Sequence, residues 1–128
     1  MWRILIIDDS KTFITAFEQL IKEVCSPQTV CVHHATSGLT GFALFEKGNY
    51  DFIFIDIEMP EVNGIEITRL IDLHHPRKKA VIVAVSFHSE IVYVEKMLSA
   101  GARHYLCKDS ITPATLEQIL WPQGKPKD

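Results

Sequence analysis

Residues 52–56 read FIFID, four consecutive apolar residues that end at Asp56. An uninterrupted apolar run of this length is typical of a strand buried on both faces of a parallel sheet. A similar run near the start of the chain, ILII at 4–7, is followed directly by Asp8 and Asp9. Two such strands that each end in aspartate predict a parallel sheet with carboxylates gathered at one edge.

Strand-like and helix-like segments alternate along the rest of the chain. Apolar, β-branched runs predict strands at 4–7, 29–35, 52–55, 80–85 and 104–107. Apolar residues at helical spacing, with capping residues at the ends, predict helices at 11–24, 37–47, 65–73, 90–100 and 113–120. Five strand–helix units in a row predict a doubly wound α/β fold, a five-stranded parallel sheet with helices on both faces.

Length and composition fit one ordinary domain. The chain has 128 residues, and we expect residues 1–121 to fold and residues 122–128 to form a flexible tail or the stub of a linker. A formal charge of −3 argues against direct binding to nucleic acid. No apolar segment resembles a signal peptide or a membrane span, so we expect a cytoplasmic protein without membrane contact. Three cysteines without CxxC spacing favour a reducing compartment.

The carboxyl ends of the predicted strands carry the polar residues of interest. They are Asp8, Asp9, Asp56, Ser86 and Lys108, and ligands of open α/β sheets bind at this edge. Crowded carboxylates repel one another, and a hard divalent cation such as Mg²⁺ neutralises them. The hydroxyl and the ammonium suit an anionic group beside the metal. The set therefore indicates phosphoryl transfer onto aspartate.

Each of these residues also has an ordinary interpretation when taken alone. Asp8 and Asp9 could cap the first helix, and Asp56 could begin a turn. Ser86 could be a helix cap, and Lys108 could be a solvated surface residue. Independent structural causes would not place all of them at strand ends, so the joint functional interpretation is favoured.

Four motifs carry a family resemblance. They are IIDDS at 6–10, FIDIEMPEVNG at 54–64, VAVS at 83–86 and YLCKD at 105–109. In this order and spacing, they make residues 2 to 120 resemble the receiver domains of response regulators. The resemblance implies the strand order 2-1-3-4-5 of flavodoxin-like folds and a phosphorylated switch in two-component signalling.

The resemblance assigns the acidic residues to a Mg²⁺ site. Asp56 would accept the phosphoryl group and bind the metal. Asp9 would bind Mg²⁺ directly, and Asp8 would help through a water molecule or by contacting a residue that binds the metal. The backbone carbonyl of Glu58 would supply a further ligand.

The resemblance also assigns roles around the phosphoryl group. Ser86 would donate a hydrogen bond to it, Lys108 would pair with it, and Tyr105 would change rotamer as Ser86 moves. Phe87 stands where most receivers have a small residue, so we expect it to narrow access for phosphodonors. Glu58 and His88 occupy the two positions that tune the lifetime of the phosphoryl group.

Two further features depart from the usual pattern. Asp109 follows Lys108 where many receivers have proline after a cis peptide bond; the sequence leaves open a cis or a trans bond here. The final helix, predicted at 113–120, is short for a receiver.

The resemblance implies partners rather than substrates. Phosphate would come from a sensor histidine kinase or a phosphotransfer protein, and a downstream protein or fused output domain would respond. The surface of the fourth helix, fifth strand and fifth helix could support a homodimer. Catalysis would be limited to self-catalysed phosphotransfer and dephosphorylation, not enzymatic turnover. Too few residues follow residue 120 for an output domain, so the sequence fits a stand-alone receiver or an excised domain.

Two alternatives remain at this point. The first is a receiver-shaped interaction module that works without phosphate. The second is an aspartate-nucleophile phosphatase of the haloacid dehalogenase type. Such phosphatases carry a DxD motif after the first strand, whereas this chain has adjacent Asp8 and Asp9 there.

Overall fold

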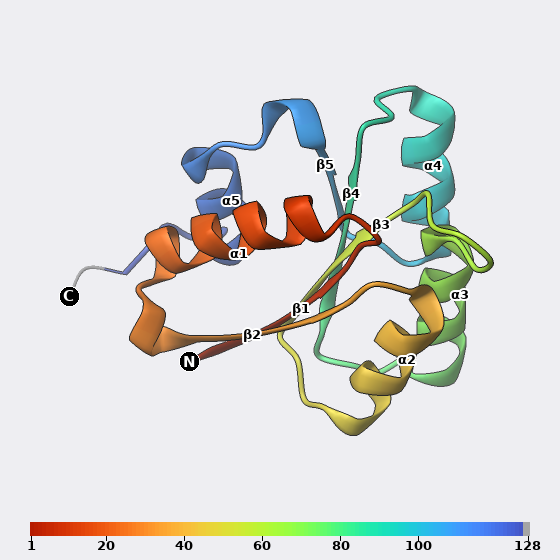
Figure 1. Ribbon diagram of the computed structural model, residues 1–128, viewed down its shortest axis with the longest axis horizontal. Coiled ribbons are helices and arrows are strands. Elements are labelled where there is room, and N and C mark those ends of the chain that lie inside the picture. Colours follow the sequence, from red (N-terminus) through yellow and green to blue (C-terminus); the bar gives the residue numbers. More distant parts are fainter. Residues whose placement is uncertain (127–128) are drawn as a thin grey trace.

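A computed structural model describes residues 1–126 and contains one five-stranded parallel sheet between two layers of helices (Figure 1). The strands are β1 (Trp2–Ile7), β2 (Val30–Ala35), β3 (Phe52–Asp56), β4 (Val81–Ser86) and β5 (His104–Cys107). The helices are α1 (Lys11–Cys25), α2 (Gly38–Lys47), α3 (Gly64–His74), α4 (Ile91–Ala100) and α5 (Pro113–Leu120). The strand order is β2-β1-β3-β4-β5, which confirms the predicted fold class. Of the predicted tail, residues 127 and 128 lie outside the described part of the chain.

The element boundaries differ from the predicted ones by two residues at most, and those of β5 and α5 are as predicted. β1 begins at Trp2, because Trp2 pairs with Val30 of β2. β3 and β4 each extend one residue further than predicted and end on Asp56 and Ser86. The backbone of the sheet therefore holds both of these polar residues directly.

Helices cover both faces of the sheet, which explains the uninterrupted apolar runs. Ile4 and Ile6 of β1 pack in a cluster with residues of α1 and α5. Leu5 and Ile7, pointing the other way, pack with residues of α2, α3 and α4. Figure 1 shows the same division, with α1 and α5 on one side of the strands. Because successive side chains in a strand alternate between faces, every position of β1 from Ile4 onward must be apolar.

Side-chain caps fix where α1 and α3 begin. The hydroxyl of Ser10 accepts a hydrogen bond of 3.1 Å from the backbone N–H of Phe13. The side chain of Asn63 accepts one of 3.0 Å from the N–H of Glu66. Such caps typically stabilise a helix by about 1 kcal/mol. Because β1 and β3 are parallel, the turns that lead to these caps lie at the same edge of the sheet.

Two tryptophans lie at the opposite edge, where the strands begin. The rings of Trp2 and Trp121 have centroids 6.1 Å apart, and Trp2 also contacts Phe52 edge to face. Lys125 lies over the Trp121 ring and donates a 2.6 Å hydrogen bond to the carbonyl of Val24. Among residues 1–126, no helix has the length and apolar character needed to span a membrane.

Candidate phosphorylation and metal site

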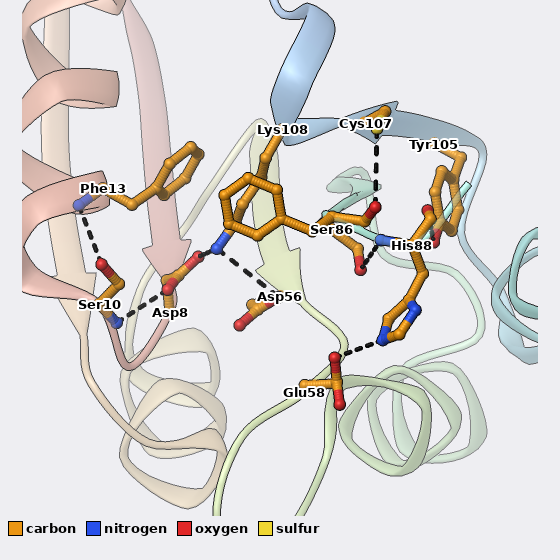
Figure 2. Close-up of polar contacts among 11 residues, drawn as sticks. Asp8, Ser10, Phe13, Asp56, Glu58, Ser86, His88, Tyr105, Cys107 and Lys108 are labelled. Carbon is orange, nitrogen blue, oxygen red and sulfur yellow. Dashed lines mark hydrogen bonds and ion pairs between the residues drawn. The ribbon is translucent and has the colours of Figure 1, made fainter. Parts of the chain in front are cut away.

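The carboxyl ends of four strands bring the predicted site residues together. Asp56 ends β3, Ser86 ends β4, and Asp8 and Lys108 directly follow β1 and β5. Figure 2 shows these side chains around one small space. The order β2-β1-β3-β4-β5 places β3 between β1 and β4, so Asp56 stands at the centre.

The acidic cluster consists of Asp8, Asp9 and Asp56, and one carboxylate oxygen of each lies within 4.8 Å of the others. Asp8 and Asp56 are buried, with exposed fractions of 1% and 7%, whereas Asp9 is exposed. One oxygen of Asp8 accepts a 2.9 Å hydrogen bond from the N–H of Ser10. Since Ser10 caps α1, the alternative role of Asp8 and Asp9 as the helix cap is not observed.

Lys108 is a buried partner of this cluster and not a solvated surface residue. Its side chain is 5% exposed, and its ammonium lies 2.8 Å from Asp8 Oδ2 and 3.8 Å from Asp56 Oδ1. The ammonium also stands 4.3 Å from the centroid of the Phe13 ring and 5.3 Å from that of Phe87. Cation–π contacts with both rings help to hold the charge in a partly dehydrated place.

The electrostatics of the cluster favour an additional cation. Burial and the neighbouring Asp8 carboxylate raise the pKa of Asp56 to about 7, and the Lys108 ammonium only partly opposes them. Three carboxylates face one ammonium, and the buried Asp8 Oδ2 makes no hydrogen bond of acceptable geometry despite its ion pair. The donor set of carboxylate oxygens therefore fits a hard divalent cation such as Mg²⁺.

The loop between β3 and α3 returns close to the backbone of Asp56. The N–H of Gly64 donates a 2.8 Å hydrogen bond to the carbonyl of Ile57. A Cβ atom at position 64 would collide with the Asp56 carbonyl, so this return requires glycine. The carboxylate of Glu58 is mostly exposed and pairs with the His88 imidazole. The Glu58 side chain is thus engaged outside the acidic cluster.

The backbone of His88 connects the two predicted switch residues. Its N–H donates a 3.1 Å hydrogen bond to the Ser86 hydroxyl, and its carbonyl accepts one of 2.7 Å from the Tyr105 hydroxyl (Figure 2). The imidazole stacks on the Tyr93 ring with centroids 4.1 Å apart. Ser86 and Tyr105 are therefore linked through one residue of the β4–α4 loop, to which both are hydrogen-bonded.

Phe87, which the sequence predicted to lie at the site, is found there, together with two aromatic residues that the sequence did not predict. Phe87 is 65% exposed, and its ring lies beside the Lys108 ammonium. Phe13 contacts Lys108, and Tyr93 contacts His88. Neither residue belongs to a sequence motif that indicates a role at the site. Phe13 could have been suspected from its position three residues after Ser10, in the first turn of α1. The bond between Lys108 and Asp109 is trans, which settles the question that the sequence left open.

The fold and the arrangement of this edge define a receiver of the response-regulator class. The family model of the response regulator receiver domain matches residues 4–120, and the chain belongs to this family. It is therefore a receiver domain of two-component signalling, a signalling domain and not a typical enzyme.

Comparisons with individual proteins agree with the assignment to the receiver family. The chain is 32% identical over 117 residues to the transcriptional regulatory protein DegU of Brevibacillus brevis, covering 91% of this chain and 48% of DegU. It is 27% identical over 118 residues to the chemotaxis protein CheY-3 of Vibrio cholerae, covering 92% and 88% of the two chains. The chain thus spans about half the length of DegU and most of CheY-3.

A solved structure supports the fold. The CheY-like receiver domain protein of Methanospirillum hungatei superimposes with a TM-score of 0.81 at 22% identity, covering 96% of this chain and 93% of its own. At this identity, the likeness concerns the fold alone.

Proposed function

We propose that Asp56 accepts a phosphoryl group from the phosphohistidine of a sensor histidine kinase or phosphotransfer protein. The observation that carries the proposal is the buried Lys108 ammonium, which pairs with both Asp8 and Asp56 at one sheet edge. A nucleophilic carboxylate, a cation beside it and further metal-type oxygen ligands are the parts that phosphoryl transfer needs.

In this proposal, each residue of the site has a separate role in phosphoryl transfer. Mg²⁺, when bound, neutralises charge on the transferred group. Asp9, Asp56 and the Glu58 carbonyl would hold it directly, and Asp8 would hold it through water. An Asp56 oxygen attacks phosphorus, the P–N bond to the donor imidazole breaks, and the imidazole takes up a proton. Lys108 shifts from Asp8 toward the new phosphoryl oxygens.

The contacts of His88 support a route from the site to the surface. In the unphosphorylated chain, the Ser86 hydroxyl accepts a hydrogen bond from the N–H of His88. When this hydroxyl donates to a phosphoryl oxygen, it turns away from His88. The β4–α4 loop is then free to shift, and the Tyr105 hydroxyl loses its fixed partner on the same residue. The surface of α4, β5 and α5 therefore differs between the two states, which is what a partner must sense.

The responding partner is a downstream protein or a fused output domain. The likeness to DegU, whose name describes a transcriptional regulatory protein, supports a fused output domain. The likeness to CheY-3, most of whose length is matched, supports a separate protein target. A homodimer through the surface of α4, β5 and α5 fits either arrangement. We place the domain at residues 1–121.

Incubation with Mg²⁺ and acetyl phosphate tests the proposal by intact mass. We expect one phosphoryl adduct, absent in the Asp56→Asn variant and after removal of Mg²⁺ with EDTA. Phe87→Ala should accelerate uptake, because the exposed ring stands beside Lys108. If neither the natural chain nor Phe87→Ala forms an adduct, a phosphate-independent module replaces this proposal. Sustained hydrolysis of a phosphomonoester would instead support the phosphatase alternative.

A further inference from the structure

Cys31 and His33 form a pair on β2, away from the acidic cluster. They are alternate residues of an edge strand, so both side chains lie on the same face of the sheet. The sulfur of Cys31 lies 3.5 Å from Nε2 of His33. Cys31 is partly exposed and His33 is exposed, so a small molecule can reach the sulfur.

Tyr50 fixes the imidazole of this pair. Its hydroxyl lies 2.7 Å from Nδ1 of His33, and the two rings meet edge to face. The Tyr50 ring is buried and fits against Gly48, where an added Cβ would collide with it. Burial raises the pKa of Tyr50, so its hydroxyl stays neutral. With Nδ1 held by Tyr50, Nε2 is directed at the sulfur.

The geometry of the three groups allows a proton to pass from the Cys31 sulfur to His33. In the imidazolium form, His33 donates from Nδ1 to the Tyr50 oxygen and from Nε2 to the Cys31 thiolate, so both contacts are satisfied. Arg3 pairs with Cys31 in the β1–β2 register, and its guanidinium lies 5.7 Å from the centre of the Tyr50 ring.

The other two cysteines lack this arrangement. Cys25 is buried, and burial raises its pKa to about 11. Cys107 is partly exposed like Cys31, but its sulfur faces the carbonyl of Phe87 at 3.9 Å. Cys107 therefore serves as an internal control for Cys31: both thiols are partly exposed, but only Cys31 has a histidine beside it.

We propose that Cys31 is a site of oxidation by hydroperoxides, with His33 as the base and Tyr50 as the residue that positions it. The thiolate attacks one peroxide oxygen, the S–O bond forms and the O–O bond breaks. The departing hydroxide takes the proton from the His33 imidazolium and leaves as water. Sulfur is oxidised by two electrons to sulfenic acid, and the peroxide is reduced. The reaction requires no phosphorylation of Asp56.

The test treats the folded chain with hydrogen peroxide, traps sulfenic acid with dimedone and follows each cysteine by peptide mass. We expect Cys31 to be labelled at least about tenfold faster than Cys107. His33→Gln should slow Cys31 to the rate of Cys107, and Tyr50→Phe should slow it by less. His34→Gln is the matched control, because His34 adjoins His33 on the opposite face and should leave the rate unchanged.

Labelling of buried Cys25 reports unfolding in every variant. If a variant labels Cys25, the comparison of Cys31 with Cys107 in the natural chain decides alone. Equal rates at those two cysteines would overturn the proposal. So would an unchanged Cys31 rate in a folded His33→Gln chain.

Discussion

At the scale of single residues, Asp56 gives the clearest pH dependence. Its pKa is about 7 in the folded chain and near 3.8 ordinarily, so between these values only the folded state holds the proton. Without metal, the free energy of unfolding therefore falls as pH rises from about 4 to about 7. Asp56→Asn carries no such proton. In EDTA, we expect this variant to be the more stable chain at pH 8, and urea unfolding at pH 4.5 and pH 8 measures the difference.

The two chains should converge in stability at pH 4.5, where Asp56 is protonated in the folded state. Equal stability at pH 8 would show that Asp56 carries its charge there at no cost.

Lys108 competes with a metal ion for the same oxygens. Its ammonium lies within 4 Å of Asp8 and Asp56, so its removal leaves the cluster more negative. We expect Lys108→Ala to bind Mg²⁺ at least about tenfold more tightly, as judged by calorimetry. Phosphoryl uptake should fall in the same variant. Lys11→Ala, on the exposed side of α1, is the control and should change neither quantity. Weaker Mg²⁺ binding in Lys108→Ala would contradict this account.

At the scale of elements, the β3–α3 loop depends on a missing side chain. Gly64→Ala introduces a Cβ that meets the Asp56 carbonyl, so the loop must move. We expect a loss of about 1–3 kcal/mol in the free energy of unfolding, together with weaker Mg²⁺ binding.

Gly124→Ala provides the comparison for this loop. Gly124 has a φ of 97° and open space around it, so this variant tests backbone strain without a collision. It should leave Mg²⁺ binding unchanged. Undiminished Mg²⁺ binding in Gly64→Ala would mean that the loop does not position Asp56.

The strands and loops also show which parts of the fold and the site could be predicted from the sequence. FIFID and ILIIDD determine two central strands and their terminal aspartates, because burial on both faces leaves few other choices. Sequence motifs cannot reveal that Lys108 lies over Phe13, because this contact depends on how the first turn of α1 and the segment after β5 meet in the folded chain. The stacking of His88 on Tyr93 was missed for the same reason: it depends on the path of the β4–α4 loop.

At the scale of the whole molecule, metal binding and folding should be linked. Mg²⁺ that binds only the folded chain stabilises it, by about 1.4 kcal/mol at ten times its Kd. Because Asp56 must lose its proton to become a full ligand, the stabilisation should increase from pH 6 to pH 8. Thermal unfolding with and without Mg²⁺ measures it. Asp9→Asn should diminish the rise in Tm, and an equal rise in that variant would argue against the acidic cluster as the binding site.

The pairing of Trp2 with Trp121 has a consequence for spectroscopy. Both indoles of this chain lie where the strands begin. Trp2 stands six positions before Asp8 of the acidic edge, about 20 Å away at the rise of a strand. Quenching of intrinsic fluorescence by a bound ion is a short-range effect. Tryptophan emission from this chain should therefore not change when the metal binds. A change in emission on addition of a phosphodonor would instead report a conformational change that extends through the whole domain.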